Sequence, residues 1–155
     1  MNADLGGSPV RARSVMYYEY ARACGATCFY DHAEQYLLKA LKLDEESSGP
    51  VHYPLIELAR LNLDQRQFVQ AVPYFERALP VVEKLDAASK DPIGFADFLD
   101  EYAQALRETD RAADAAVFTA RAADIRSRHS GAVSKTDRTP YGKHCIKKDE
   151  SPQSQ

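Results

Sequence analysis

Residues 55–79 read LIELARLNLDQRQFVQAVPYFERAL, and the alanines in this stretch decide the fold. Ala59 and Ala71 are twelve residues apart, and Ala78 follows seven residues after Ala71. Two helices approach closely only where side chains are small, so this spacing is typical of a helical hairpin. The same spacing recurs once before this stretch and once after it, which predicts three repeated hairpins. The repeated alanines are Ala21, Ala33 and Ala40 in the first unit and Ala103, Ala115 and Ala122 in the third.

Apolar residues recur at helical spacing between polar breaks, and no alternating β-branched run indicates a strand. Residues 45–50 and 87–92 combine turn-forming residues with a proline that can open the next helix. A short polar interruption divides each of the three resulting segments. The predicted fold class is therefore an all-α solenoid of three stacked antiparallel helix pairs. The expected helices span residues 10–25 and 30–44, 51–63 and 67–86, and 93–107 and 111–129.

The positions that flank the alanines carry matching residues in the three units. They are Tyr17, Tyr20, Cys24 and Leu37, then Leu55, Leu58, Asn62 and Phe75, then Leu99, Tyr102, Leu106 and Thr119. This arrangement resembles the tetratricopeptide repeat (TPR) family over about residues 14–127, which implies a right-handed superhelix. Residues 71–79 resemble the longer kinesin-light-chain-type repeat, in which a proline is tolerated in the second helix. Asn62 and Thr119 are polar at positions where the family pattern has a bulky side chain. No unit has the proline that usually ends the second helix.

The expected domain boundaries follow from these repeats. Residues 1–9 are expected to form a flexible N-terminus, residues 10–129 the repeat domain, and residues 130–155 a disordered tail, because the last segment has little to bury. The segment Tyr141–Cys145 is unusually specific for such a tail, and it could dock back onto the domain or be read by a partner. The basic residues 143–148 are expected to be solvated. The three repeats span about residues 14–47, 52–86 and 96–129.

In a stack of helical hairpins, the first helix of each pair lines a concave face that is the expected partner site. Aromatic and arginine side chains supply most of the energy at protein interfaces, and this face is rich in both. Arg22 and Arg60 occupy equivalent positions and could together bind a partner's carboxylate. Alternatively, each arginine pairs with an acid on its own helix, such as Glu19 or Glu57. The candidate partner-binding residues are Tyr18, Arg22, Tyr53, Ile56, Arg60, Asp100, Gln104 and Arg107.

Some members of the TPR family bind acidic chaperone tails through a clamp of lysine and asparagine. The matching positions here hold other residues, so the clamp is absent and we expect no binding of that kind. The acids at Asp97, Asp100 and Glu101 would repel such a tail. The residues at the clamp positions are Tyr18, Arg22, Glu57, Asp97 and Glu101.

The three cysteines, Cys24, Cys28 and Cys145, form an odd and sparse set that does not indicate a disulfide framework. Cys24 is expected to be a small core residue. Cys24 and Cys28 are four residues apart, a spacing that could suit metal ligands on one helix face, but no histidine or cysteine partner pair completes a zinc pattern, so we expect no metal. No phosphate loop, nucleophile elbow or metalloprotease helix is present, and we expect neither enzymatic activity nor a cofactor.

Acidic and basic residues number 23 and 20, a balance that argues against nucleic-acid or anionic-membrane binding. No apolar run approaches the roughly 18 residues of a membrane span. Residues 1–9 lack a signal-peptide pattern, so a cytoplasmic location is expected, although a chain already trimmed of its leader would look the same.

The function that the sequence favours is an adaptor or scaffold that binds a peptide or partner protein on its concave face. One alternative is a dedicated chaperone for a secreted protein, because small three-repeat secretion chaperones have this size. A second is self-assembly into a homo-oligomer through the uncovered ends of the stack. An enzyme using Cys24, His32 and Glu34 is the least favoured alternative.

Overall fold

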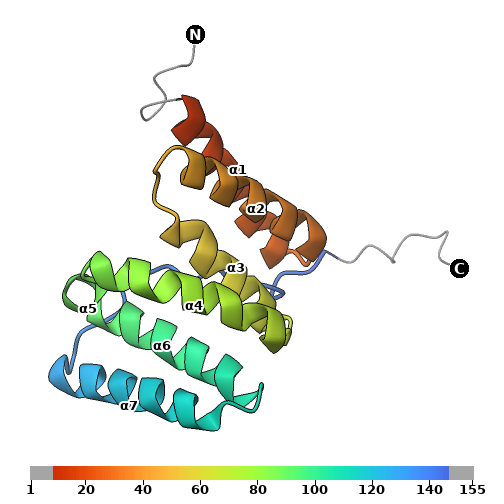
Figure 1. Ribbon diagram of the computed structural model, residues 1–155. Coiled ribbons are helices and arrows are strands. Elements are labelled where there is room, and N and C mark those ends of the chain that lie inside the picture. Colours follow the sequence, from red (N-terminus) through yellow and green to blue (C-terminus); the bar gives the residue numbers. More distant parts are fainter. Residues whose placement is uncertain (1–8, 147–155) are drawn as a thin grey trace, which may run out of the picture.

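The computed structural model describes residues 9–146, and this part of the chain contains seven helices and no strand (Figure 1). Three long antiparallel pairs stack in chain order, as the all-α solenoid prediction required. The ends of the six long helices lie within two residues of the expected positions. A single-turn helix, α5, occupies the second predicted break. The helices are α1 (Pro9–Ala26), α2 (Tyr30–Glu46), α3 (His52–Asp64), α4 (Phe68–Lys84), α5 (Ala87–Lys90), α6 (Pro92–Arg107) and α7 (Ala112–Arg128).

The repeated alanines are all buried in the helix stack. All nine are at most 1% exposed. Larger side chains fill the space beside them, and the ring of Phe75 stacks on Tyr102 at 5.4 Å between centroids, which joins the second pair to the third. Asn62 is buried among these apolar groups because its side-chain amide donates to the carbonyl of Leu58 at 2.8 Å.

The turn inside each pair has the same backbone geometry in all three units. Cys28, Arg66 and Asp110 each adopt a left-handed conformation, with φ of 75°, 61° and 62°. The next residue then donates its N–H to a carbonyl five residues back, which closes the helix end. These N–H groups belong to Phe29, Gln67 and Arg111, and they bond Cys24, Asn62 and Leu106 at 2.8, 2.8 and 2.9 Å. An identical turn explains why the alanine spacing is constant within a unit but variable between units.

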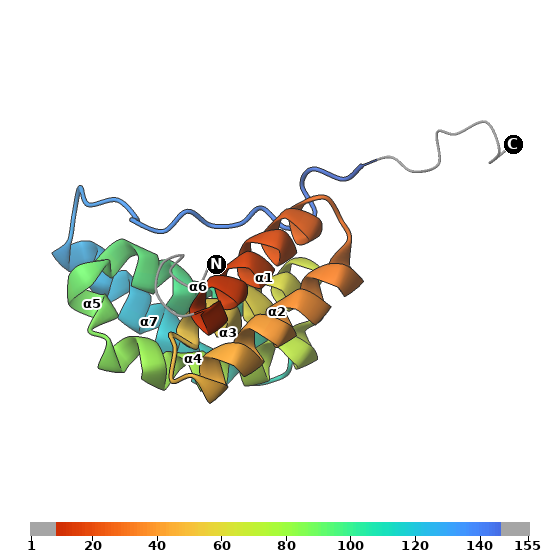
Figure 2. The same cartoon turned by 90° about the horizontal axis from the view of Figure 1, so that it is seen from above.

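The chain after α7 differs from the disordered tail that the sequence led us to expect. It turns back and crosses the side of the molecule formed by α1, α3 and α6 (Figure 2). Thr139 and Tyr141 are each only 2% exposed. Composition did not indicate this because a few specific side chains and a cross-link, rather than many apolar residues, hold the segment. Residues 147–155 of the expected tail and residues 1–8 of the expected flexible N-terminus lie outside the described residues.

Among the described helices, none is both long and apolar enough to span a lipid bilayer.

Candidate functional site

The candidate site is the first-helix face, meaning the side formed by α1, α3 and α6, together with the segment that crosses it. We call residues 134–145 the strap. From residue 132 to residue 140 the chain has no regular secondary structure, and Figure 2 shows it running in an open, elongated path. Beneath the strap lies a groove of about 810 Å³, lined by α1, α3, α5, α6, the end of α4 and strap residues 135–137. A neighbouring pocket of about 280 Å³ lies between α6, α7 and the strap.

The strap is first held at the start of α6 by Asp91. This carboxylate caps the helix by accepting from the N–H of Gly94 at 3.1 Å. It also accepts from the N–H of Lys135 at 3.0 Å and from the hydroxyl of Thr136 at 2.8 Å. Burial alone would raise the pKa of Asp91, but these three donors outweigh it and lower the pKa. One residue therefore both begins a helix and fixes the strap.

Arg138 binds two first helices at once. Its guanidinium donates to both carboxylate oxygens of Asp64, at 2.7 and 2.9 Å, and to Glu101 at 2.9 Å. The second oxygen of Glu101 accepts from Arg60 at 2.8 Å. Burial alone would lower the pKa of Arg138, but the bonds to Asp64 and the charge of Glu101 raise it. The four side chains form an ion-pair cluster in which the strap supplies one of the two cations.

Tyr141 enters a socket built from α1 and α3. Its hydroxyl donates to Glu57 at 2.5 Å, and Tyr18 donates to the same carboxylate at 3.5 Å. Burial, followed by the charge of Glu57, raises the pKa of Tyr141 above its ordinary value of 10.0. The ring lies directly over Gly25, where a Cβ atom would come within 2.4 Å of it. Only glycine at this position leaves room for the ring.

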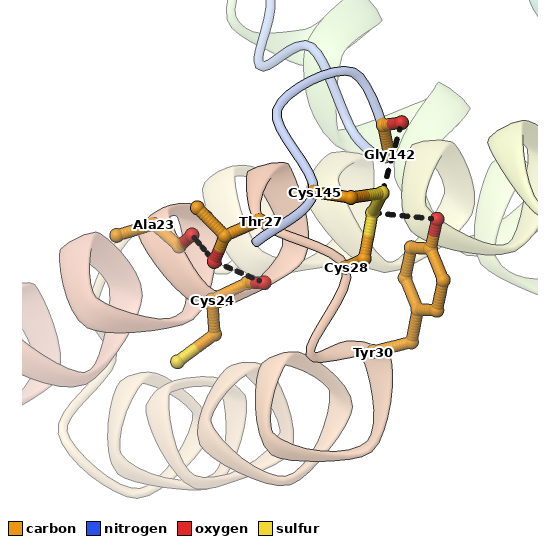
Figure 3. Close-up of a disulfide and its surroundings, with 7 residues drawn as sticks. All are labelled: Ala23, Cys24, Thr27, Cys28, Tyr30, Gly142 and Cys145. Atoms are coloured by element: carbon orange, nitrogen blue, oxygen red, sulfur yellow. Dashed lines mark hydrogen bonds between the residues drawn. A yellow bond between two sulfur atoms is a disulfide. The ribbon is translucent and has the colours of Figure 1, made fainter. Parts of the chain in front are cut away.

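The end of the strap is cross-linked to the turn between α1 and α2 (Figure 3). A disulfide joins Cys28 to Cys145, with 5.0 Å between their Cα atoms. The N–H groups of Gly142 and His144 donate to the carbonyls of Gly25 and Ala26 at 3.0 and 2.9 Å. The expectation that the cysteines form no disulfide was therefore wrong, because a pair 117 residues apart leaves no spacing signal.

Cys24 is the remaining cysteine, and it is a free, buried core residue as expected. Figure 3 shows its sulfur pointing away from the disulfide. Within residues 9–146, no group of three or more histidine, cysteine or acidic side chains is placed to hold a metal ion.

The structure separates the predicted partner-binding residues into three groups. Asp100 lines the smaller pocket, where it and Asp97 are paired with Arg126. Gln104 and Arg107 line neither cavity. Arg60 lines both cavities. The predicted residues that line the groove are Tyr18, Arg22, Tyr53, Ile56 and Arg60.

The two arginines expected to hold a partner's carboxylate are bonded to groups of this chain instead. Arg22 pairs with Glu19 at 3.1 Å, as the alternative interpretation predicted, and also donates to the hydroxyl of Thr139 at 2.6 Å. Arg60 pairs with Glu101 on another helix rather than with Glu57, and its side chain is only 5% exposed.

The sequence analysis named Arg22, which donates to Thr139 of the strap, but it missed most of the other contacts between the strap and the helices. The helix residues of these contacts lie far in sequence from the strap residues, so no local pattern marks them. The one available signal was the unusual specificity of residues 141–145. The missed residues are Gly25, Glu57, Asp64, Asp91, Glu101, Arg138, Thr139 and Tyr141.

Comparison with known proteins adds support for the fold. No family model matches the chain, and no curated protein sequence matches it. Among solved structures, the chain is similar to BtubC (BKLC) from P. vanneervenii, with a TM-score of 0.68 and 19% sequence identity. The alignment covers 81% of this chain and 51% of that one, so this chain spans about half of that protein's length. At this identity the likeness shows the fold alone, which is that of a TPR-like helical repeat protein.

Proposed function

We propose that the protein is a non-enzymatic interaction scaffold that binds an extended segment of a partner protein on its first-helix face. One observation carries the proposal: the chain's own strap lies on this face as an elongated segment, and α1, α3 and α6 each supply side chains that bind it. TPR-like folds commonly bind proteins, which supports the same assignment. The fold alone does not decide function, so the proposal depends on this site.

The groove beneath the strap offers a partner further anchoring points. Val15, Tyr53 and Leu85 line it and are 40%, 48% and 43% exposed. Exposed aromatic and aliphatic side chains around a concave surface are typical of sites that bury a partner's side chains. Because the strap covers the groove but does not fill it, a partner segment can bind beside the strap or in its place.

Affinity capture with a matched pair of variants tests the proposal. The full chain is immobilised and exposed to an extract of the source organism, with and without dithiothreitol. The groove variant carries Val15→Ser and Tyr53→Ser. The control carries Val69→Ser and Val117→Ser on α4 and α7, where both side chains are more exposed, at 71% and 63%.

We expect the groove variant to lose partners that the wild type and the control retain. Retention of every partner by the groove variant would count against the proposal. The chaperone and self-assembly alternatives stay predictions, because no feature of the described residues favours either of them.

A further inference from the structure

The strap presents two side chains that fit separate receptors on the first-helix face. Arg138 enters the site formed by Asp64 and Glu101, and Tyr141 enters the socket formed by Glu57 and Gly25. The two residues are three positions apart, with Thr139 bonded to Arg22 between them. A segment of another protein that carries an arginine and a tyrosine at the same spacing can bind the same two sites.

We propose that the first-helix face recognises an extended partner segment with an arginine three residues before a tyrosine, and that the strap is an internal competitor held in place by the Cys28–Cys145 disulfide. The inference rests on the proposed function, to which it adds the partner's chemistry and the control of the site.

Charge complementarity supports an arginine-bearing occupant. Without Arg138, the carboxylates of Asp64 and Glu101 would have only Arg60 as a cationic partner in this cluster. With the strap in place these carboxylates are 21% and 15% exposed, and its departure would remove the arginine that bonds both of them. The planar guanidinium of arginine matches two carboxylates at once, whereas a lysine ammonium does not. The vacated face therefore favours a segment that replaces this arginine.

Thr139 and Tyr141 of the strap are buried, and Tyr141 packs with the hydrophobic core, whereas the rest of the strap runs over the helix stack. The alanines and aromatic rings that join the helix pairs are buried between helices, and none of these contacts needs the strap. A segment that belonged to the core would fill the space beneath it, because protein interiors are closely packed. Here a groove of about 810 Å³ remains under strap residues 135–137. The strap can therefore leave its place while the stack stays folded.

The disulfide sets how strongly the strap competes. A segment tethered near its own binding site acts at an effective concentration on the order of millimolar. The disulfide at the end of the strap also prevents this end from dissociating. Cys145 is exposed, whereas Cys28 is half-buried, so Cys145 is the accessible end of the bond. A partner at micromolar concentration therefore competes poorly with the cross-linked strap, and reduction of the bond weakens this competition.

Reduction by a dithiol needs no further reactant. A thiolate of the reagent attacks the Sγ of Cys145 and forms a mixed disulfide, and Cys28 leaves as a thiolate that takes up a proton. The second thiol of the reagent then displaces Cys145. Two electrons and two protons pass to the protein, and the reagent leaves as a cyclic disulfide.

The test measures binding of a fluorescein-labelled peptide of residues 134–144 to the full chain by fluorescence anisotropy. The proteins are the oxidised wild type, the wild type in dithiothreitol, Cys145→Ser, and a strap variant that combines Cys145→Ser with Arg138→Ala and Tyr141→Ala. The strap variant weakens the competitor and leaves the receptors intact. Circular dichroism confirms that each protein is helical before it is used.

We expect the strap variant to bind the peptide at least about tenfold more tightly than the oxidised wild type, with the reduced wild type and Cys145→Ser between them. A peptide with Arg138→Ala and Tyr141→Ala should bind none of them. Adding Gly25→Ala to the strap variant should abolish binding, because its Cβ would occupy the space of the tyrosine ring. This substitution favours helix formation, so lost binding would not reflect a broken α1.

Equal binding to the oxidised wild type and the strap variant would overturn the proposal, as would no binding to any folded protein. Sedimentation showing that the reduced wild type dimerises by exchanging straps would also overturn it, since the occupant would then be a second copy. If the peptide fails to bind but the Val15 and Tyr53 variant still loses captured partners, this inference falls and the proposed function stands.

Discussion

At the scale of single residues, the contact between Tyr141 and Glu57 governs how the strap is held. Glu57 is 4% exposed, and its hydrogen bond from Tyr141, at 2.5 Å, is much shorter than the one from Tyr18 at 3.5 Å. Without the Tyr141 hydroxyl, the buried carboxylate of Glu57 keeps only the longer hydrogen bond from Tyr18 of these two. A hydrogen bond to a charged group typically contributes about 1.5 to 3 kcal/mol.

We expect Tyr141→Phe to lower the free energy of unfolding of the oxidised protein by about 1.5 to 3 kcal/mol, measured by urea denaturation. The control is Tyr53→Phe at a half-exposed tyrosine, which should change stability by less than about 0.5 kcal/mol. A Tyr141→Phe effect no larger than that of the control would mean that Glu57 is satisfied without the strap.

At the scale of elements, the turn inside each helix pair carries a side chain in a conformation that favours glycine. Asp110 has a φ of 62° and is exposed, and the neighbouring Glu108 has an ordinary helical φ of −76°. Asp110→Gly should raise the free energy of unfolding by about 0.5 to 1 kcal/mol, because glycine adopts left-handed backbone without strain. Glu108→Gly removes the same charge but should lower stability by about 0.5 to 1 kcal/mol.

Thermal and urea denaturation of the two variants check this prediction together. Because both substitutions remove one acid and add one glycine, charge and chain entropy cancel in the comparison. A loss of stability in Asp110→Gly as large as that in Glu108→Gly would show that the turn does not require a left-handed residue.

The elements also show why the helices could be predicted and the strap could not. Alanine spacing and polar breaks are local patterns, and they predicted both ends of all six long helices within two residues. The short helix α5 was missed because a single turn has no periodicity. The strap has no local preference at all: Arg138 and Tyr141 are fixed by Asp64 and Glu57, which lie 74 and 84 residues away in sequence.

The same reasoning applies to the candidate site. Tyr18, Arg22, Tyr53, Ile56 and Arg60 were placed on the correct helices because their positions follow from the repeat register, and they line the groove. The pairing of Arg22 with Glu19 on its own helix was predicted, but partners on other helices and on the strap could not be, because they depend on how the pairs are stacked. Arg60 of the second pair, for example, donates to Glu101 of the third pair, 41 residues away in sequence.

At the scale of the whole molecule, the strap joins the last helix pair to the first. A stack of helix pairs has contacts only between neighbours, so its terminal units can open independently. Here the chain leaves α7, crosses α6 and α3, and is cross-linked to the turn after α1, which closes the stack into a loop (Figure 2). We expect this closure to make the three pairs unfold as one unit.

Replacing both Cys28 and Cys145 by serine should lower the free energy of unfolding by about 2 to 5 kcal/mol, because the cross-link restricts a long loop in the unfolded chain. The wild type in dithiothreitol loses the cross-link but keeps every cysteine side chain, and therefore controls for the substitutions themselves. Hydrogen exchange should then show where the molecule loosens. In the double variant, the amides of Gly142 and His144, which bond the end of α1, should exchange much faster than amides in the middle of the helices. Uniform acceleration across all helices would instead mean that the strap is needed for the stack to fold, and that it cannot open alone to admit a partner.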